Sequence, residues 1–209
     1  MSEDARGVCG VLLAAGAGTR FGGAKLLAPL PADAHGVRAG TPLVLAAFEH
    51  LRTATPHVVV VVRPGDPALR LALEQAGARV VQCERASEGM GHSLAAGIAA
   101  TADAAAWLVA LADMPWVEPQ TVARLAARLQ EGASIVAPRY RGRRGHPVGF
   151  AARHRDVLLQ LRGDAGARSV VMAHADEVEE VDVDDPGVLR DVDRPEDLAV
   201  DAGSAGGRD

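Results

Sequence analysis

The sequence has little of several features that mark common protein classes. It contains only two cysteines, Cys9 and Cys83, whose spacing fits no zinc motif, and we expect both to be buried free thiols. No apolar run is long enough to cross a membrane, and residues 1–4 do not resemble a signal peptide. The net charge of −5 lacks the basic excess of a general nucleic-acid binder. These absences predict a cytoplasmic protein whose partners include neither a membrane nor a nucleic acid.

Lysine is scarcer than any other charged residue type, because Lys25 is the only lysine among 209 residues. Every other basic side chain besides histidine is an arginine. An ammonium is a compact, strongly hydrated point charge, and it is not equivalent to a planar guanidinium. The lone lysine is therefore a candidate functional residue, and the plainer alternative is a surface residue without a role.

Apolar runs alternate with helix signals along the chain. Strands are expected at residues 8–14, 57–63, 78–82, 105–112, 134–138, 148–151 and 178–183. Helices are expected at 42–52 with Thr41 as the cap, at 66–77, 94–101 and 119–130, on both sides of 162–168, and from 195 onward. Residues 31–40 carry two glycines and a proline and are expected to form an exposed loop.

This alternation predicts an α/β fold of three layers, in which a mainly parallel sheet has helices on both faces. Right-handed crossovers then place the loops that follow the strands along one edge of the sheet, where such folds bind ligands. We expect one domain over residues 1–201 and a disordered tail over 202–209.

A glycine-rich stretch follows the first expected strand. Residues 12–25 read Leu-Leu-Ala-Ala-Gly-Ala-Gly-Thr-Arg-Phe-Gly-Gly-Ala-Lys. Glycines permit the backbone angles and the close approach with which main-chain N–H groups surround phosphates. Arg20 and Lys25 add fixed positive charge beside this loop. The stretch therefore predicts a site for a nucleoside triphosphate.

Two common phosphate loops do not fit this stretch. A Walker A loop needs Gly-Lys followed by Ser or Thr, which the chain lacks. A dinucleotide-binding loop needs a third glycine where Phe21 stands, and an acidic residue where Arg63 ends the second expected strand.

Asp113 follows the apolar run 107–112 and precedes Met114-Pro115. A carboxylate at the carboxyl end of a strand, next to a triphosphate loop, suits Mg²⁺. The alternative is that Asp113 caps a turn or a helix. If the two loops meet at the sheet edge, Asp113, Arg20 and Lys25 are the candidate catalytic residues.

The glycine-rich stretch resembles the signature Leu-Ala-Ala-Gly-x-Gly/Ser-x-Arg-Met-Gly-x-x-Lys of the molybdenum cofactor cytidylyltransferases, with Phe21 in place of Met. Guanylyltransferases of the same cofactor and sugar-phosphate nucleotidyltransferases are relatives of this family. The resemblance extends over nearly the whole chain, because Leu111-Ala112-Asp113-Met114-Pro115 also matches a family block. It implies a Rossmann-like nucleotide-diphospho-sugar transferase fold, Mg²⁺ as cofactor, and transfer of CMP from CTP to molybdenum-molybdopterin. A molybdoenzyme or its chaperone is then a possible partner.

The resemblance also implies a set of nucleotide-binding residues in the loop and in the segment 89–94. Ala14-Ala15-Gly16, where the guanylyl relatives have Ala-Gly-Gly, favours cytosine over guanine. For Ser93, capping of the following helix is an equally good interpretation. The implied residues are Leu13, Ala14, Ala15, Gly16, Gly18, Thr19, Arg20, Lys25, Gly89 and Ser93.

Three later blocks match the family as well. Asp193, in Asp-Val-Asp-Arg-Pro-Glu-Asp-Leu, is the implied second metal ligand, although Asp193 with Glu196 also reads as a capping box. His146, in a Gly-His-Pro block, is implied to orient the acceptor. Asp164 and Arg168 are implied acceptor-binding residues, with helix capping as the alternative for Asp164.

Two other classes of function remain as hypotheses. One is an NADP-dependent oxidoreductase that binds the 2′-phosphate with Arg63, against which the displaced glycine counts. The other is a carrier that holds the molybdenum cofactor without catalysis. Retention of both Lys25 and Asp113 favours an enzyme.

Overall fold

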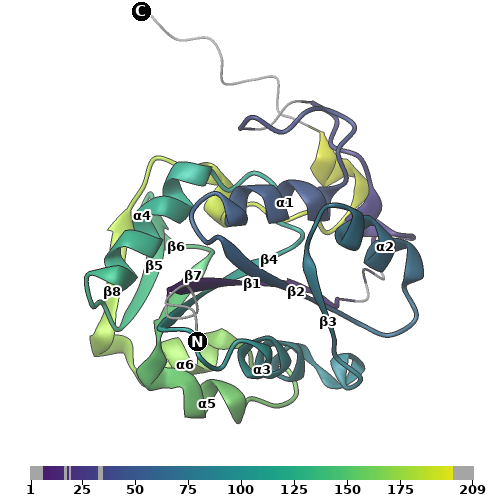
Figure 1. Ribbon diagram of the computed structural model, residues 1–209. Coiled ribbons are helices and arrows are strands. Elements are labelled where there is room, and N and C mark those ends of the chain that lie inside the picture. The colour runs from purple at the N-terminus through teal and green to yellow at the C-terminus, as the bar shows by residue number, and fades with distance from the viewer. Residues whose placement is uncertain (1–6, 17, 19, 33–34, 200–209) are drawn as a thin grey trace, which may run out of the picture.

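The structure is a computed structural model that describes residues 7–16, 18, 20–32 and 35–199. It contains an eight-stranded sheet with helices on both faces (Figure 1). The strands are β1 Val8–Ala14, β2 His57–Val62, β3 Arg79–Gln82, β4 Ala106–Leu111, β5 Ile135–Tyr140, β6 Arg143–Arg144, β7 Val148–Ala151 and β8 Val178–Asp182.

The α-helices connect these strands. They are α1 Leu43–Arg52, α2 Pro67–Gln75, α3 Met90–Ala100, α4 Pro119–Gln130, α5 Arg155–Leu159 and α6 Ala167–Ala173. Short 3₁₀ helices are η2 Lys25–Leu27, η3 Ala86–Glu88, η4 Ala152–His154, η5 Ala175–Glu177, η6 Pro186–Leu189 and η7 Pro195–Leu198. Within the described residues, no helix combines the length and the apolar character needed to span a bilayer.

The sheet is mostly parallel, as the sequence predicts. Its strand order is β3-β2-β1-β4-β7-β5-β6, and β8 pairs with β5. Parallel pairing joins β1 to β2 and to β4, β2 to β3, and β5 to β8. The short strand β7 runs antiparallel between β4 and β5, and β6 forms a hairpin with β5. The expected three-layer α/β fold is therefore confirmed, with an antiparallel insertion at β7.

Two hydrophobic clusters fill the two sides of the sheet. Helices α1, α2 and α4 lie on one side, and α3, α5 and α6 lie on the other (Figure 1). Along β1, Leu12 packs with the first group of helices, whereas Val11 and Leu13 pack with the second. This alternation follows from the two-residue period of a strand. Burial on both faces explains why β1 and β2 read as continuous apolar runs.

Some local expectations need correction. Thr41 is not the cap of α1, because the N-cap residue is Pro42, which makes no side-chain cap bond. Asp66, at the start of the next expected helix, is the N-cap of α2, since its carboxylate accepts a hydrogen bond from the Leu69 N–H at 3.1 Å. Cys9 and Cys83 are buried free thiols, as expected. In the insertion, the described residues between 31 and 40 are mostly exposed, although Val37 packs against a small apolar cluster.

Candidate active site

The glycine-rich loop leaves β1 at the carboxyl edge of the sheet and returns into η2. Gly18 and Gly22 have φ angles of 59° and 77°, which L-residues with side chains rarely adopt. The Phe21 N–H donates to the Gly18 carbonyl at 3.0 Å, and the Lys25 N–H donates to the Gly23 carbonyl at 2.8 Å. These turns place Lys25 above the end of the sheet. Thr19, an expected nucleotide ligand, lies outside the described residues.

Charged side chains of alternating sign meet beside this loop. Lys25 Nζ lies 2.8 Å from Asp113 Oδ2 and 3.8 Å from Asp193 Oδ1. Arg20 Nη1 lies 2.8 Å from the other oxygen of Asp193. Only 11% of the Lys25 side chain is exposed, compared with 72% for Arg20. The structure thus brings together Arg20, Lys25, Asp113 and Asp193, the four charged residues that the sequence predicts to be catalytic or metal-binding.

A backbone contact aligns the two carboxylates. The Val192 N–H donates to the Asp113 carbonyl at 2.9 Å, so the segment that carries Asp193 runs beside the end of β4. Asp193 does not cap η7 with Glu196; instead Asp197 accepts hydrogen bonds from the Asp193 and Arg194 N–H groups. The capping-box alternative for Asp193 is therefore wrong, and its carboxylate faces Lys25 and Arg20.

The donor set fits a divalent metal that arrives with a nucleotide. Asp113 and Asp193 offer hard carboxylate oxygens, and one ammonium contacts both of them. Among the described residues there is no group of three or more His, Cys, Asp or Glu side chains able to hold a metal. Mg²⁺ is commonly held by one or two carboxylates, with water and substrate phosphates as its other ligands. Asp113 and Asp193 match that arrangement.

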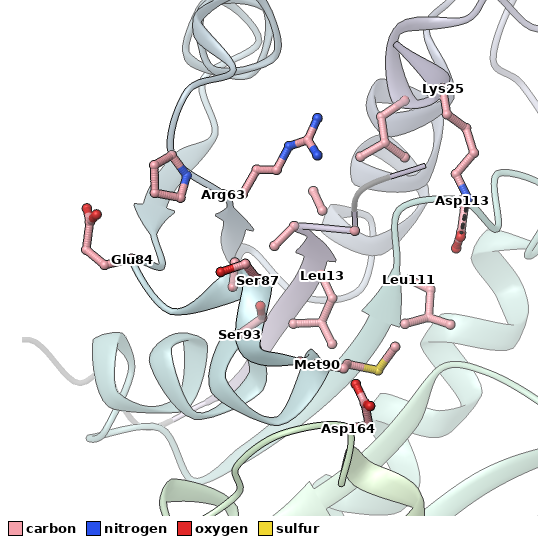
Figure 2. Close-up of a pocket in the computed structure, with 17 residues that line it drawn as sticks. Leu13, Lys25, Arg63, Glu84, Ser87, Met90, Ser93, Leu111, Asp113 and Asp164 are labelled. Atoms are coloured by element: carbon pink, nitrogen blue, oxygen red, sulfur yellow. Dashed lines mark hydrogen bonds and ion pairs between the residues drawn. The ribbon is translucent and has the colours of Figure 1, made fainter. Parts of the chain in front are cut away.

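A cavity of about 600 Å³ opens next to the loop (Figure 2). It is bounded by the ends of β1, β2 and β4, by the segment from η3 into α3, and by Asp164. Of the expected site residues, those that line it are Leu13, Ala14, Ala15, Gly16, Lys25, Gly89, Ser93, Asp113 and Asp164. Gly18 lies instead at a smaller hollow below the loop.

Several residues that line the cavity are not among those that the sequence predicts for the site. Arg63 lies at the end of β2 and reaches over the cavity, with Glu84 and Ser87 on the same side (Figure 2). Met90 lies at the opposite end, close to Asp164 in the same view. In the sequence, Arg63 stands at the end of an expected strand, and only the oxidoreductase hypothesis gives it a role. No local pattern pointed to Glu84 or Ser87.

The segments 89–93 and 162–166 interlock at the cavity floor. Gly89 has a φ of 124°, and a Cβ there would collide with the backbone of Gly163. The Gly91 N–H donates to the Gly163 carbonyl at 2.8 Å, and the Gly163 N–H donates to His92 Nδ1 at 3.2 Å. These bonds fix Asp164 at the edge of the cavity.

Both capping alternatives in these segments are wrong. Gly89 is the N-cap of α3, so Ser93 lies inside the helix, 3% exposed. Gly166 is the N-cap of α6 and Asp164 makes no side-chain cap bond there.

Two expected acceptor residues do not line the cavity. Arg168 is exposed on α6, and His146 lines a separate small hollow that is mainly apolar. Burial lowers the pKa of His146, while the negative charges of Asp113 and Asp191 oppose that shift. Its Nδ1 is buried and has no hydrogen-bond partner among the described residues. His146 is thus near the carboxylates but outside the described cavity.

Known proteins resemble this chain in sequence and in fold. Nicotine blue oxidoreductase from Paenarthrobacter nicotinovorans is 36% identical over 203 residues, which cover 91% of this chain and 94% of the relative. The crystal structure of Rv0371c from Mycobacterium tuberculosis is 30% identical, with a TM-score of 0.78 and coverage of 94% of this chain and 96% of that one. A manganese complex of Rv0371c is matched at 27% identity, with a TM-score of 0.72 and coverage of 91% and 95%.

The match to a protein family covers most of the chain. Residues 10–178 match the MobA-like NTP transferase domain, and this range includes the glycine-rich loop, Asp113 and the cavity floor. Asp193 lies beyond the matched range, although the structure places it against Lys25. The chain belongs to the family of MobA-like NTP transferase domains.

Proposed function

We propose that this chain is a cytidylyltransferase that moves CMP from CTP to the terminal phosphate of molybdenum-molybdopterin. The products are molybdopterin cytosine dinucleotide and pyrophosphate. The observation that carries the proposal is the Lys25 ammonium between Asp113 and Asp193, at the mouth of a cavity of about 600 Å³. A fixed cation and two carboxylates beside a glycine-rich loop suit a metal-bound triphosphate.

The reaction forms one P–O bond and breaks another. An oxygen of the acceptor phosphate attacks the α-phosphorus of CTP, and the bond from this phosphorus to the β-phosphate oxygen breaks. A phosphate monoester has a second pKa of about 6, so the attacking group is already anionic near neutral pH. No general base is therefore required. Catalysis is then a matter of orientation and charge.

In the proposed mechanism, Lys25 and Arg20 supply the positive charge that stabilises the departing pyrophosphate. Negative charge grows on pyrophosphate as the bond breaks, so a cation held near it stabilises the transition state more than the ground state. Lys25 is largely buried, and its ammonium therefore acts with less screening than the exposed Arg20. A divalent metal on Asp113 and Asp193 supplies further electrostatic stabilisation to the phosphates when it is bound.

The two ends of the cavity have different proposed roles. We assign contact with the base to Ala15, Gly89 and Ser93, which all line the cavity. Asp164 and Met90 mark the acceptor side (Figure 2). His146 and Arg168 would contribute to acceptor binding only from outside the described cavity, so their proposed roles are more peripheral than the sequence indicated.

Pyrophosphate release tests this proposal. The protein is supplied with each nucleoside triphosphate, with and without molybdenum cofactor, in Mg²⁺ or Mn²⁺. We expect release with CTP that depends on both the cofactor and the metal. Equal release with GTP would indicate a guanylyl or unselective enzyme, and binding of the cofactor without any release would favour a carrier.

A second candidate, an oxidoreductase, is favoured by one observation. The relative with 36% identity carries the name nicotine blue oxidoreductase. Arg63 lines the cavity and could hold the 2′-phosphate of NADPH, which would donate hydride to an organic acceptor. A fluorescence titration with NADPH distinguishes the candidates. A saturable change that Arg63→Ala abolishes would support the oxidoreductase, and no change would remove it.

A further inference from the structure

A cation–π pair lies beside the two carboxylates. The guanidinium carbon of Arg190 is 3.7 Å from the centre of the Trp116 ring. Trp116 follows Asp113 on the loop after β4, and only 8% of it is exposed. Arg190 precedes Asp193 on the segment after η6 and is half-buried. The pair thus joins the two chain segments that carry the proposed metal ligands.

Arg190 also reaches the far side of the turn that holds Asp193. Its Nη2 donates to the carbonyl oxygens of Asp197 and Ala199, both at 3.0 Å. The Asp197 carboxylate in turn accepts from the N–H groups of Arg194 at 2.7 Å and Asp193 at 2.8 Å. These backbone donors hold the pKa of Asp197 below its ordinary value, because they stabilise the carboxylate. Asp193 therefore lies in a turn that Arg190 ties together.

The chain before Asp193 is fixed by backbone contacts. Gly187 packs so closely on the Trp116 carbonyl that a Cβ there would collide with it. The Val192 N–H donates to the Asp113 carbonyl at 2.9 Å. These contacts set the path of the segment up to Val192, whereas the residues from 193 to 199 are mostly exposed or half-buried. Arg190 provides the link from the buried Trp116 to that exposed turn.

We propose that Arg190, stacked on Trp116, is a positioning residue that holds Asp193 beside Asp113 for a divalent metal. The inference rests on the proposed function, because it assigns Asp193 to the metal. Groups that orient a metal ligand without touching the metal typically change metal affinity by about 10- to 100-fold when they are removed. Loss of Arg190 should therefore weaken metal binding, with a smaller effect on kcat once metal is saturating.

Binding of Mn²⁺, followed by electron paramagnetic resonance in the presence of CTP, tests the inference. We expect Arg190→Ala to bind Mn²⁺ about 10- to 100-fold more weakly than the wild type. Arg190→Lys keeps the cation over the ring but loses the planar donors, so it should recover only part of the affinity. Arg194→Ala is the matched control, because it removes an exposed guanidinium from the same turn and keeps the Arg194 N–H bond to Asp197. Unchanged affinity in Arg190→Ala would overturn the inference.

Amide hydrogen exchange separates this inference from the proposed function. In Arg190→Ala the amides of Asp193 and Arg194 should exchange faster, while those of α4 keep the wild-type rate. Trp116→Phe, which keeps an aromatic ring, should give a smaller effect in the same direction and covers the case in which the alanine variant folds poorly. If the wild type binds no Mn²⁺, the proposed metal role fails. If exchange at Asp193 and Arg194 is the same in Arg190→Ala and the wild type, the positioning role fails.

Discussion

The Lys25 ammonium lies between Asp113 and Asp193, 2.8 Å from an oxygen of the first and 3.8 Å from an oxygen of the second. In this arrangement the lysine neutralises the same carboxylates that would hold a divalent metal. A metal and this ammonium therefore compete for Asp113, unless a bound triphosphate draws the ammonium away. Lys25 would thus oppose metal binding before the nucleotide arrives and assist the reaction afterwards.

Replacing Lys25 by alanine should separate these two effects. We expect Lys25→Ala to bind Mn²⁺ more tightly than the wild type when no nucleotide is present, because two carboxylates lose a competing cation. With CTP and acceptor, kcat should fall by about 10²- to 10³-fold, with a smaller change in KM for CTP. Electron paramagnetic resonance of Mn²⁺ measures the metal affinity, and steady-state kinetics measure kcat and KM.

The arginine substitution serves as the control for charge against geometry. Lys25→Arg keeps the positive charge but places a wider group between the carboxylates, so we expect only partial activity. Full activity in Lys25→Arg would mean that charge alone matters. Full activity in Lys25→Ala would remove the residue from the mechanism.

Asp113→Ala should abolish metal-dependent turnover while the protein stays folded. Asp113 follows β4 at the sheet edge and is partly exposed, and its removal leaves Lys25 a second carboxylate partner in Asp193. Thermal unfolding followed by circular dichroism checks the fold, and pyrophosphate release across a Mg²⁺ titration checks the activity. An active variant that still responds to metal would contradict the assignment.

Ala15→Gly should relax the preference for CTP over GTP. Ala15 is half-buried in the cavity wall. The resemblance to the cofactor cytidylyltransferases implies glycine at this position in the guanylyl relatives. One methyl group in a pocket changes discrimination by about tenfold, so the ratio of kcat/KM for the two nucleotides should fall by that order. An unchanged ratio would place the choice of base elsewhere, with Gly89 to Ser93 as the next segment to test.

The stability of the protein should decrease as the pH falls below about 6.5, the ordinary pKa of histidine. Burial lowers the pKa of His154, the nearby His174 lowers it further, and Glu177 opposes the shift. Between the folded and unfolded pKa values the unfolded chain binds more protons, so the free energy of unfolding rises with pH across this range. His154 Nε2 lies 2.9 Å from the Ser134 hydroxyl, a contact that a glutamine can partly replace.

Urea unfolding at pH 7.5 and pH 5.5 measures this dependence. His154→Gln should lose less stability between the two pH values than the wild type does. His57→Gln is the control, because it removes an exposed histidine at the start of β2 and leaves this cluster intact. Equal losses in the wild type and in His154→Gln would contradict the role given to His154.

The sequence predicted the architecture because its signals are local. Valine runs, the Asp66-Pro67 helix start and the apolar stretch before Asp113 each depend on neighbouring residues, and the corresponding elements are present. The loop and Asp113 could be placed at one edge because parallel strands direct their carboxyl ends the same way. The family block had also pointed to Asp193, and the structure brings it to the same edge.

Other features depend on contacts between distant segments. The link from Arg190 to Trp116 and the interlock of Gly89 with Gly163 join residues far apart in the chain, and no local pattern encodes them. The capping alternatives for Ser93, Asp164 and Asp193 were wrong because each helix begins one to four residues from the expected position. Another residue is therefore the cap in each case. His146 and Arg168 have matching blocks in the family, but such blocks do not determine whether a side chain reaches the cavity.

Following the α-phosphorus of CTP tests the proposed transfer of CMP most directly. The protein is incubated with molybdenum cofactor, Mg²⁺ and CTP labelled with ³²P at either the α or the γ position. We expect the α label to appear in a cytosine dinucleotide of molybdopterin and the γ label to appear in pyrophosphate. Asp113→Ala should form neither product. Absence of α label from the molybdopterin product, under conditions in which the wild type is folded and binds the cofactor, would contradict the proposed transfer.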